Sequence, residues 1–86
     1  MSEKIWSDDA WEDYLYWQIS DKKILRRIND LLKSVEREGP LKGLGKPEPL
    51  KYREGYSRRI TEEHRLVYDV EDGVIYIYSC KGHYRN

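Results

Sequence analysis

Three side chains in the C-terminal half of the chain have the chemical types that cleave RNA without a metal. Attack by the 2′-hydroxyl of RNA on the neighbouring phosphorus needs a base for the hydroxyl, a cation for the developing negative charge and an acid for the departing 5′-oxygen. Glu48, Arg65 and His83 are the candidates for these three roles. They lie far apart in the sequence, so the fold must bring them together.

Glu48, the candidate base, lies in the segment KPEPLK between Pro47 and Pro49. A proline restricts its own backbone and that of the residue before it, so this loop holds a carboxylate in place better than a glycine-rich loop would. The competing interpretation is an ordinary exposed loop glutamate, and the local sequence does not separate the two.

Arg65, the candidate phosphate clamp, lies in the segment SRRITEEHRLVY at residues 57–68. That segment carries more charge than strands usually do. A guanidinium keeps its charge and donates in a fork that suits phosphate oxygens, although a surface salt bridge to Glu62 or Glu63 is the alternative. Other basic residues are expected to form a rim that follows an RNA backbone. They are Lys46, Lys51, Arg58 and Arg59.

His83, the candidate acid, lies in the C-terminal segment KGHY with Tyr84 beside it. An imidazole ordinarily titrates at about 6.5, so it can give up a proton near neutrality. Tyr84 is expected to stack on a base or to hold the phosphate. The alternative is an inert histidine in a tail. His64 is interpreted as a histidine whose hydrogen bonds are satisfied within a strand.

Neither a metal site nor cysteine chemistry is expected. The only histidines are His64 and His83, and no HxxxH or CxxC spacing occurs, so we expect no metal or other cofactor. Cys80 is the only cysteine and is expected to be a small buried hydrophobe rather than a nucleophile. With no disulfide possible within the chain, a reducing cytoplasm is expected. No apolar run is long enough to span a membrane, and the N-terminus does not resemble a signal peptide.

The formal net charge is zero, with sixteen basic and sixteen acidic residues, which alone argues against a nucleic-acid binder. The charges are unevenly distributed, however. Residues 1–13 hold one lysine against five carboxylates, whereas residues 46–59 hold five basic residues against two acidic ones. The chain can therefore present a basic face to one partner.

Eighty-six residues predict one domain, spanning residues 1–86. A short strand at 4–6 is followed by a helix capped by Ser7 and a second helix capped by Ser20 or Asp21 and ended by Gly39-Pro40. Residues 41–55 are predicted to be a loop. Three strands are predicted at 56–61, 64–70 and 74–80, with a hairpin turn at 71–73. The order β-α-α-β-β-β predicts an α+β fold, with two helices on one face of a small, twisted, mostly antiparallel sheet.

Long strings of this sequence resemble the YoeB-type toxins of the RelE/ParE superfamily. They are IWS at 5–7, WEDYLYWQISD at 11–21, GKPEPLK at 45–51, SRRITEEHRLVY at 57–68 and the terminal His83-Tyr84. The resemblance implies the fold above and metal-free cleavage of mRNA in the ribosomal A site, leaving a 2′,3′-cyclic phosphate. It implies that Glu48 is the base, Arg65 the transition-state clamp and His83 the acid, with Tyr84 orienting the RNA.

The resemblance also implies partners. They are a cognate YefM-like antitoxin, the ribosome with its mRNA, operator DNA bound only by the toxin–antitoxin complex, and a second copy of the chain. Two features depart from the family pattern. The connector 52–56 is short, which could shift Glu48 relative to Arg65, and Arg85-Asn86 follow the terminal His-Tyr pair. Two alternatives stay open, namely a ParE-like toxin that inhibits DNA gyrase and a member that binds without cleaving.

Overall fold

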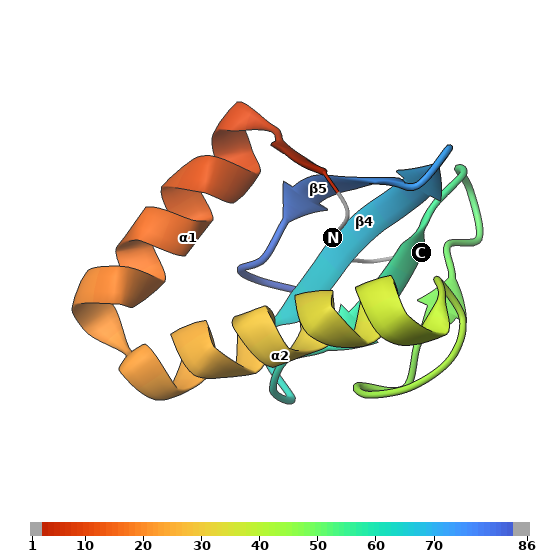
Figure 1. Cartoon of the computed structure of the whole chain (residues 1–86). Helices are drawn as coiled ribbons and strands as arrows, with labels where there is room; N and C mark the ends of the chain where they lie inside the picture. The colour runs from red at the N-terminus through yellow and green to blue at the C-terminus, as the bar shows by residue number, and fades with distance from the viewer. Residues whose placement is uncertain (1–2, 84–86) are drawn as a thin grey trace.

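The computed structural model describes residues 3–83, in which two helices pack against a five-stranded mixed sheet (Figure 1). The elements are β1 (Lys4–Trp6), α1 (Asp8–Ser20), α2 (Lys22–Glu38), β2 (Glu48–Pro49), β3 (Tyr56–Arg59), β4 (Arg65–Glu71) and β5 (Val74–Ser79). The α+β class and the two N-terminal helices are thus confirmed. The predicted loop at 41–55 differs in one respect, because it contains the two-residue strand β2.

The strand order across the sheet is β1-β5-β4-β3-β2. β1 runs parallel to β5, and the other neighbours pair antiparallel, which confirms a mostly antiparallel sheet. The central position of β4 is decisive for the site. β3 lies between β4 and β2, so Arg65 of β4 and Glu48 of β2 lie two strands apart in the sheet.

Both helices begin where the capping residues predict. The Ser7 hydroxyl accepts a hydrogen bond from the amide of Ala10 at 3.0 Å, and the Asp21 carboxylate accepts from the amides of Lys23 and Ile24. These bonds satisfy amide groups that have no partner within the helix itself. α2 ends at Glu38 and is capped by Gly39, whose positive φ of 91° suits a residue without a Cβ.

The apolar stripe of α2 forms the core against the sheet. Its buried side chains pack with those of β4 and β5 that face the helices, and Figure 1 shows α2 lying across the sheet. The α2 members are Ile28, Leu31, Leu32 and Val35, and the strand members are Leu66, Tyr68, Ile75 and Ile77. This packing leaves the opposite face of the sheet to carry polar side chains.

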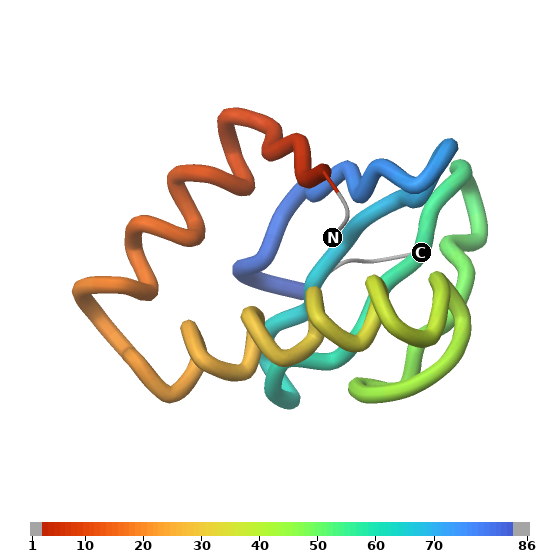
Figure 2. Tube along the Cα trace, viewed as in Figure 1, coloured from red at the N-terminus to blue at the C-terminus, as the bar shows by residue number. Residues whose placement is uncertain are grey.

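Two connections set the geometry around the sheet. The predicted hairpin turn is confirmed, because Asp72 and Gly73 both have positive φ, of 52° and 78°, between the paired ends of β4 and β5. The second connection, residues 39–47, turns back past the end of α2 towards β3, as the tube in Figure 2 shows. The amide of Arg59 donates to the carbonyl oxygen of Gly45 at 2.6 Å and fixes the end of this loop to β3.

Candidate functional site

Glu48 and Arg65, the candidate base and clamp, contact each other. A terminal nitrogen of Arg65 lies 3.4 Å from Oε1 of Glu48, and the Arg65 side chain is only 12% exposed while that of Glu48 is 56% exposed. The short 52–56 connector therefore does not separate the two residues. A shielded guanidinium beside an accessible carboxylate can bind a phosphate and leave the carboxylate within reach of a neighbouring hydroxyl.

The pleat of the sheet explains this contact. Glu48 pairs with Ser57 of β3, and Ser57 pairs with Val67 of β4. Side chains two residues apart on a strand share a face, so Arg65 and Val67 lie on the same face of β4. The Ser57 hydroxyl accepts a hydrogen bond from Nε of Arg65 at 3.1 Å and so helps to aim the guanidinium. Sequence reasoning missed this role of Ser57, although its alternation with Arg58 was a usable signal.

His83, the candidate acid, lies on the segment that follows β5. The amide of Arg65 donates to the carbonyl oxygen of Gly82 at 3.0 Å, which ties this segment to the first residue of β4. The His83 ring lies with Nε2 3.0 Å from the carbonyl oxygen of Glu62, so its contact is with the 61–64 turn and not with Glu48. Tyr84 lies outside the described residues.

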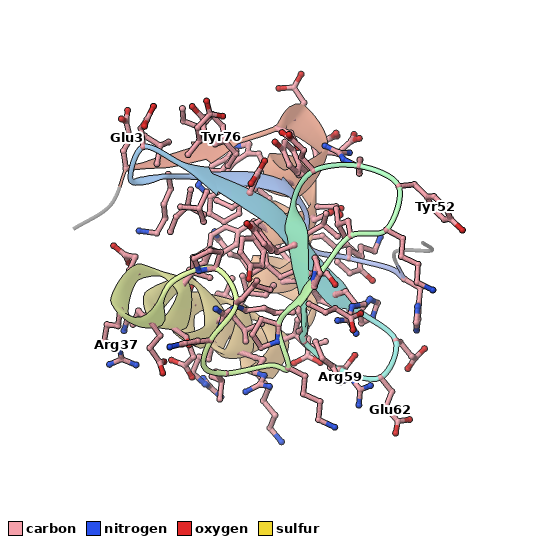
Figure 3. The ribbon with its side chains drawn as sticks, turned by 90° about the vertical axis from the view of Figure 1, so that its right-hand side faces the viewer. Glu3, Arg37, Tyr52, Arg59, Glu62 and Tyr76 are labelled. Atoms are coloured by element: carbon pink, nitrogen blue, oxygen red, sulfur yellow. The ribbon has the colours of Figure 1, made fainter. Side chains whose placement is uncertain are left out.

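Three of the four residues of the predicted basic rim are exposed, namely Lys46, Lys51 and Arg59. In Figure 3, Arg59 extends outward at the same end of the molecule as Glu62, whose carbonyl oxygen contacts His83. The exposed side chains of Lys46, Lys51 and Arg59 can therefore contact a polyanion.

The expectation that Arg58 belongs to this rim is wrong. Its exposed fraction is 0%, because strand alternation points it to the helix side of the sheet, opposite Leu66. Its five N–H donors all bond within the protein, and none is left for RNA. The acceptors are the hydroxyl oxygens of Tyr68 and Ser34 and the carbonyl oxygens of Gly39, Lys42 and Leu44, at 2.6–3.0 Å.

A groove of about 490 Å³ adjoins the site on the side of the 50–55 loop. Arg53 lies at its edge, with its guanidinium 4.6 Å from the centre of the Tyr78 ring. The lining also carries the carboxylates of Glu54, Asp69 and Glu71. Because these carboxylates repel anions, this groove suits a phosphate less well than the side of the sheet that carries Arg65 and Arg59.

Two ionisable groups of the core have shifted pKa values. Burial raises the pKa of the Cys80 thiol to about 12, and the Asp13 carboxylate adds to the effect. Burial also raises the pKa of Tyr68, against the opposing effect of the Arg58 guanidinium that bonds its hydroxyl. Cys80 is 0% exposed, as expected of a small buried hydrophobe. Within residues 3–83, no cluster of three or more His, Cys, Asp or Glu side chains is arranged to hold a metal ion.

None of the helices in the described part of the chain is long and apolar enough to cross a bilayer.

The expectation that His64 lies within a strand is wrong, because β4 begins at Arg65 and His64 belongs to the turn before it. Its Nδ1 accepts a hydrogen bond from the amide of Gly82 at 2.9 Å, so this histidine bonds the segment that carries His83. Sequence reasoning missed this contact, because nothing in the spacing of residues 64 and 82 shows that they meet.

Residues 6–84 match the family model described as YoeB-like toxin of bacterial type II toxin–antitoxin systems. Toxin YoeB of Escherichia coli K12 is 55% identical over 82 residues, which cover 93% of this chain and 96% of that protein. Toxin YoeB of Synechocystis is 54% identical over 78 residues, covering 88% of this chain and 90% of its own.

Solved structures of YoeB toxins share the fold of this chain. The YoeB dimer from Staphylococcus aureus superimposes with a TM-score of 0.92 at 54% identity, covering 96% of this chain and 98% of that one. The YoeB–YefM complex from the same organism gives a TM-score of 0.91 at 52% identity, covering 98% and 99%. A YoeB/ParE toxin from Agrobacterium tumefaciens gives 0.88 at 41% identity, covering 95% and 99%.

Proposed function

Because this chain belongs to the YoeB-like toxins of bacterial type II toxin–antitoxin systems, we propose that it is a ribosome-dependent endonuclease that cuts mRNA in the A site. The observation that carries this proposal is the contact between Glu48 and Arg65, at 3.4 Å, beside a segment that ends in His83. Glu48, Arg65 and His83 are proposed to supply the base, the cation and the acid from three separate parts of the fold.

The proposed reaction starts when a phosphate of the mRNA binds the Arg65 guanidinium in place of the Glu48 carboxylate. Glu48 then takes the proton of the 2′-hydroxyl as its oxygen attacks the adjacent phosphorus. The bond between phosphorus and the 5′-oxygen breaks, and protonated His83 gives its proton to that oxygen. The products are a 2′,3′-cyclic phosphate and a 5′-hydroxyl, and no metal takes part. Arg65 stabilises the charge on the phosphoryl oxygens in the transition state.

The ribosome is proposed as the partner that supplies substrate orientation. The Glu48 carboxylate lies on an open surface, with 56% of its side chain exposed, so the chain alone offers little to align a flexible RNA for in-line attack. Lys46, Lys51 and Arg59 are proposed to contact the phosphate backbone of mRNA or of ribosomal RNA. Tyr84 is proposed to orient the RNA. The reaction would then take place in the cytoplasm, on translating ribosomes.

Two protein partners are proposed from the relatives. A structure from Staphylococcus aureus contains YoeB with YefM, and another is a YoeB dimer. We therefore propose that this chain binds a YefM-like antitoxin and forms a homodimer, and that operator DNA is bound only by the toxin–antitoxin complex. Size-exclusion chromatography with light scattering on the free chain and on the co-expressed pair measures both assemblies directly.

Toeprinting of translating ribosomes tests the enzyme proposal. The wild-type protein should produce cuts in the A-site codon, while Glu48→Gln and His83→Ala should not. Glu54→Gln is the matched control, because Glu54 is an exposed glutamate of the neighbouring loop. Equal cutting by wild type and His83→Ala would remove His83 from the mechanism, and no cutting by any protein would refute the nuclease proposal.

Gyrase inhibition is the second candidate function, since the Agrobacterium tumefaciens structure is described as a YoeB/ParE toxin. A gyrase inhibitor needs no acid–base set, so the Glu48–Arg65 contact favours the nuclease. A supercoiling assay separates the two. Inhibition of gyrase by the wild-type protein, with translation unaffected, would reverse the ranking. Ribosome co-sedimentation without any cleavage product would instead indicate a member that binds without cleaving.

A further inference from the structure

The segment between β5 and His83 is bonded to the rest of the protein at two residues. At the first, the amide of Cys80 donates to the Asp13 carboxylate at 3.0 Å, and its carbonyl oxygen accepts from Nε1 of Trp17 at 2.9 Å. At the second, the amide of Gly82 donates to Nδ1 of His64 at 2.9 Å, and its carbonyl oxygen accepts from the amide of Arg65 at 3.0 Å.

The second attachment lies directly before His83. Gly82 has a φ of 86°, a conformation that side chains disfavour, and the space beside its Cα is open. The chain therefore turns at Gly82 by virtue of its backbone freedom, and neighbouring side chains do not impose the turn. Two hydrogen bonds hold the Gly82 backbone, one to Nδ1 of His64 and one from the amide of Arg65. Only the first of these two bonds involves a side chain.

The His64 ring is itself held in place. Its ring centre lies 4.8 Å from that of Trp17 at an interplanar angle of 73°, an edge-to-face contact. Its own amide donates to Oγ1 of Thr61 at 3.1 Å, and its carbonyl oxygen accepts from the amide of Ile60 at 2.9 Å. Because Nδ1 accepts the Gly82 proton, the ring is neutral in this contact and carries its proton on Nε2.

We propose that His64 is a positioning residue for the cleavage reaction. Its Nδ1 fixes the peptide of Gly82 and thereby holds the His83 imidazole near the 61–64 turn, directly before Arg65 begins β4. This inference rests on the proposed function of His83 as general acid. His64 itself touches no RNA and transfers no proton. It links the strand that carries the clamp to the segment that carries the acid.

Loss of this bond should affect the rate at saturation more than binding. A general acid contributes about 10²–10⁴-fold to a rate, and a shift of about 1 Å in a reacting group can cost about 10²-fold. The exposed basic residues proposed to bind RNA lie on segments other than the one that carries His83. We therefore expect a fall of about 10- to 100-fold in the single-turnover rate, with the half-saturating ribosome concentration unchanged.

Three variants separate positioning from simple packing. His64→Asn keeps a hydrogen-bond acceptor close to the position of Nδ1, whereas His64→Gln places its acceptor nearer the position of Nε2, and His64→Leu has none. Single-turnover cleavage on programmed ribosomes should be within about threefold of wild type for Asn and reduced about 10- to 100-fold for Gln and Leu. Equal rates in Gln, Leu and wild type would overturn the proposal, as would an Asn variant no faster than Leu.

Amide hydrogen exchange of the glycine-labelled protein gives a readout that does not depend on activity or on a fully stable Leu variant. The Gly82 amide should be protected in wild type and in His64→Asn, and should exchange faster in His64→Gln. An unchanged exchange rate of the Gly82 amide in His64→Gln would contradict the proposal even if the cleavage rate of this variant fell.

If wild type does not cleave, or His83→Ala cleaves normally, the proposed function has failed. If both behave as proposed but the His64 variants do not, only this inference has failed.

Discussion

Replacing the buried Arg58 with methionine should strongly destabilise the protein. The guanidinium donates five hydrogen bonds, three of them to carbonyl oxygens of residues 39, 42 and 44 in the loop after α2. It also lies at the C-terminal end of α2, where the helix dipole favours a cation. Methionine fills much of the same volume but leaves these acceptors without a donor.

The size of the effect follows from opposing contributions. Each hydrogen bond from a charged group contributes about 1.5–3 kcal/mol to the free energy of unfolding. The desolvation of the buried guanidinium offsets several kcal/mol of the total from the five bonds. Removing one side of such a buried network typically costs about 3–5 kcal/mol. For a domain of this size, about 4–8 °C is lost per kcal/mol, so the melting temperature should fall by at least about 12 °C.

Urea and thermal denaturation followed by circular dichroism measure this effect. Arg59→Met is the matched control, because Arg59 is the next residue on β3 and its side chain is exposed. It should denature close to the wild-type midpoint. Arg58→Lys should be nearly as unstable as Arg58→Met, because an ammonium cannot reproduce the planar fork of donors. Equal midpoints for the Arg58 and Arg59 variants would refute the assignment of Arg58 to the core.

Three further outcomes follow from the structure. The Cys80 thiol should resist a thiol reagent at pH 8 in the native protein and react after addition of urea, since it is buried and its pKa is about 12; rapid native reaction would contradict its burial. The free energy of unfolding should fall as pH rises above 9 for Cys80 and above 10 for Tyr68. In each case the unfolded group ionises while the folded one, with its raised pKa, keeps its proton to a higher pH, and for Cys80 the slope approaches about 1.4 kcal/mol per pH unit between pH 9 and its folded pKa of about 12. A flat profile from pH 8 to 11 would contradict this. Gly45→Ala should lower the urea midpoint more than Gly73→Ala, because both glycines have positive φ but only the first would place a Cβ within 2.6 Å of Leu31; equal midpoints would show that the loop relaxes freely.

Much of the fold follows from local sequence signals. Ser7 and Asp21 cap the two helices because their side-chain oxygens can accept amide protons at a helix start, and that chemistry is visible in the sequence. Asp72-Gly73 predicts its hairpin for a similarly local reason. The sequence does not predict β2, because a strand of two residues, one of them Pro49, is too short to show periodicity and pairs only because β3 lies beside it.

The site could be predicted only in part. The chemistry of Glu48 and Arg65 and the resemblance both predict these two residues, and the structure brings them into contact across β3. The charge of Arg58 predicts an exposed side chain, whereas strand alternation and the buried Leu66 and Tyr68 on the neighbouring strand indicate an inward face. The bond between His64 and Gly82 joins residues 18 apart in sequence. Such a pairing depends on how β4 and the segment after β5 are aligned, which no local pattern specifies.

The most direct test of the account is the rate and product chemistry of cleavage on programmed ribosomes in the presence and absence of a metal chelator that spares ribosome integrity. We expect the 5′ fragment to end in a 2′,3′-cyclic phosphate, with the toxin's cleavage rate unaffected by chelation. Glu48→Gln should be slower by about 10²–10⁴-fold, and Glu54→Gln should match wild type. A fragment ending in a free 3′-hydroxyl, or a Glu48→Gln rate equal to that of wild type, would contradict the assignment of the Glu48–Arg65 pair as the catalytic centre.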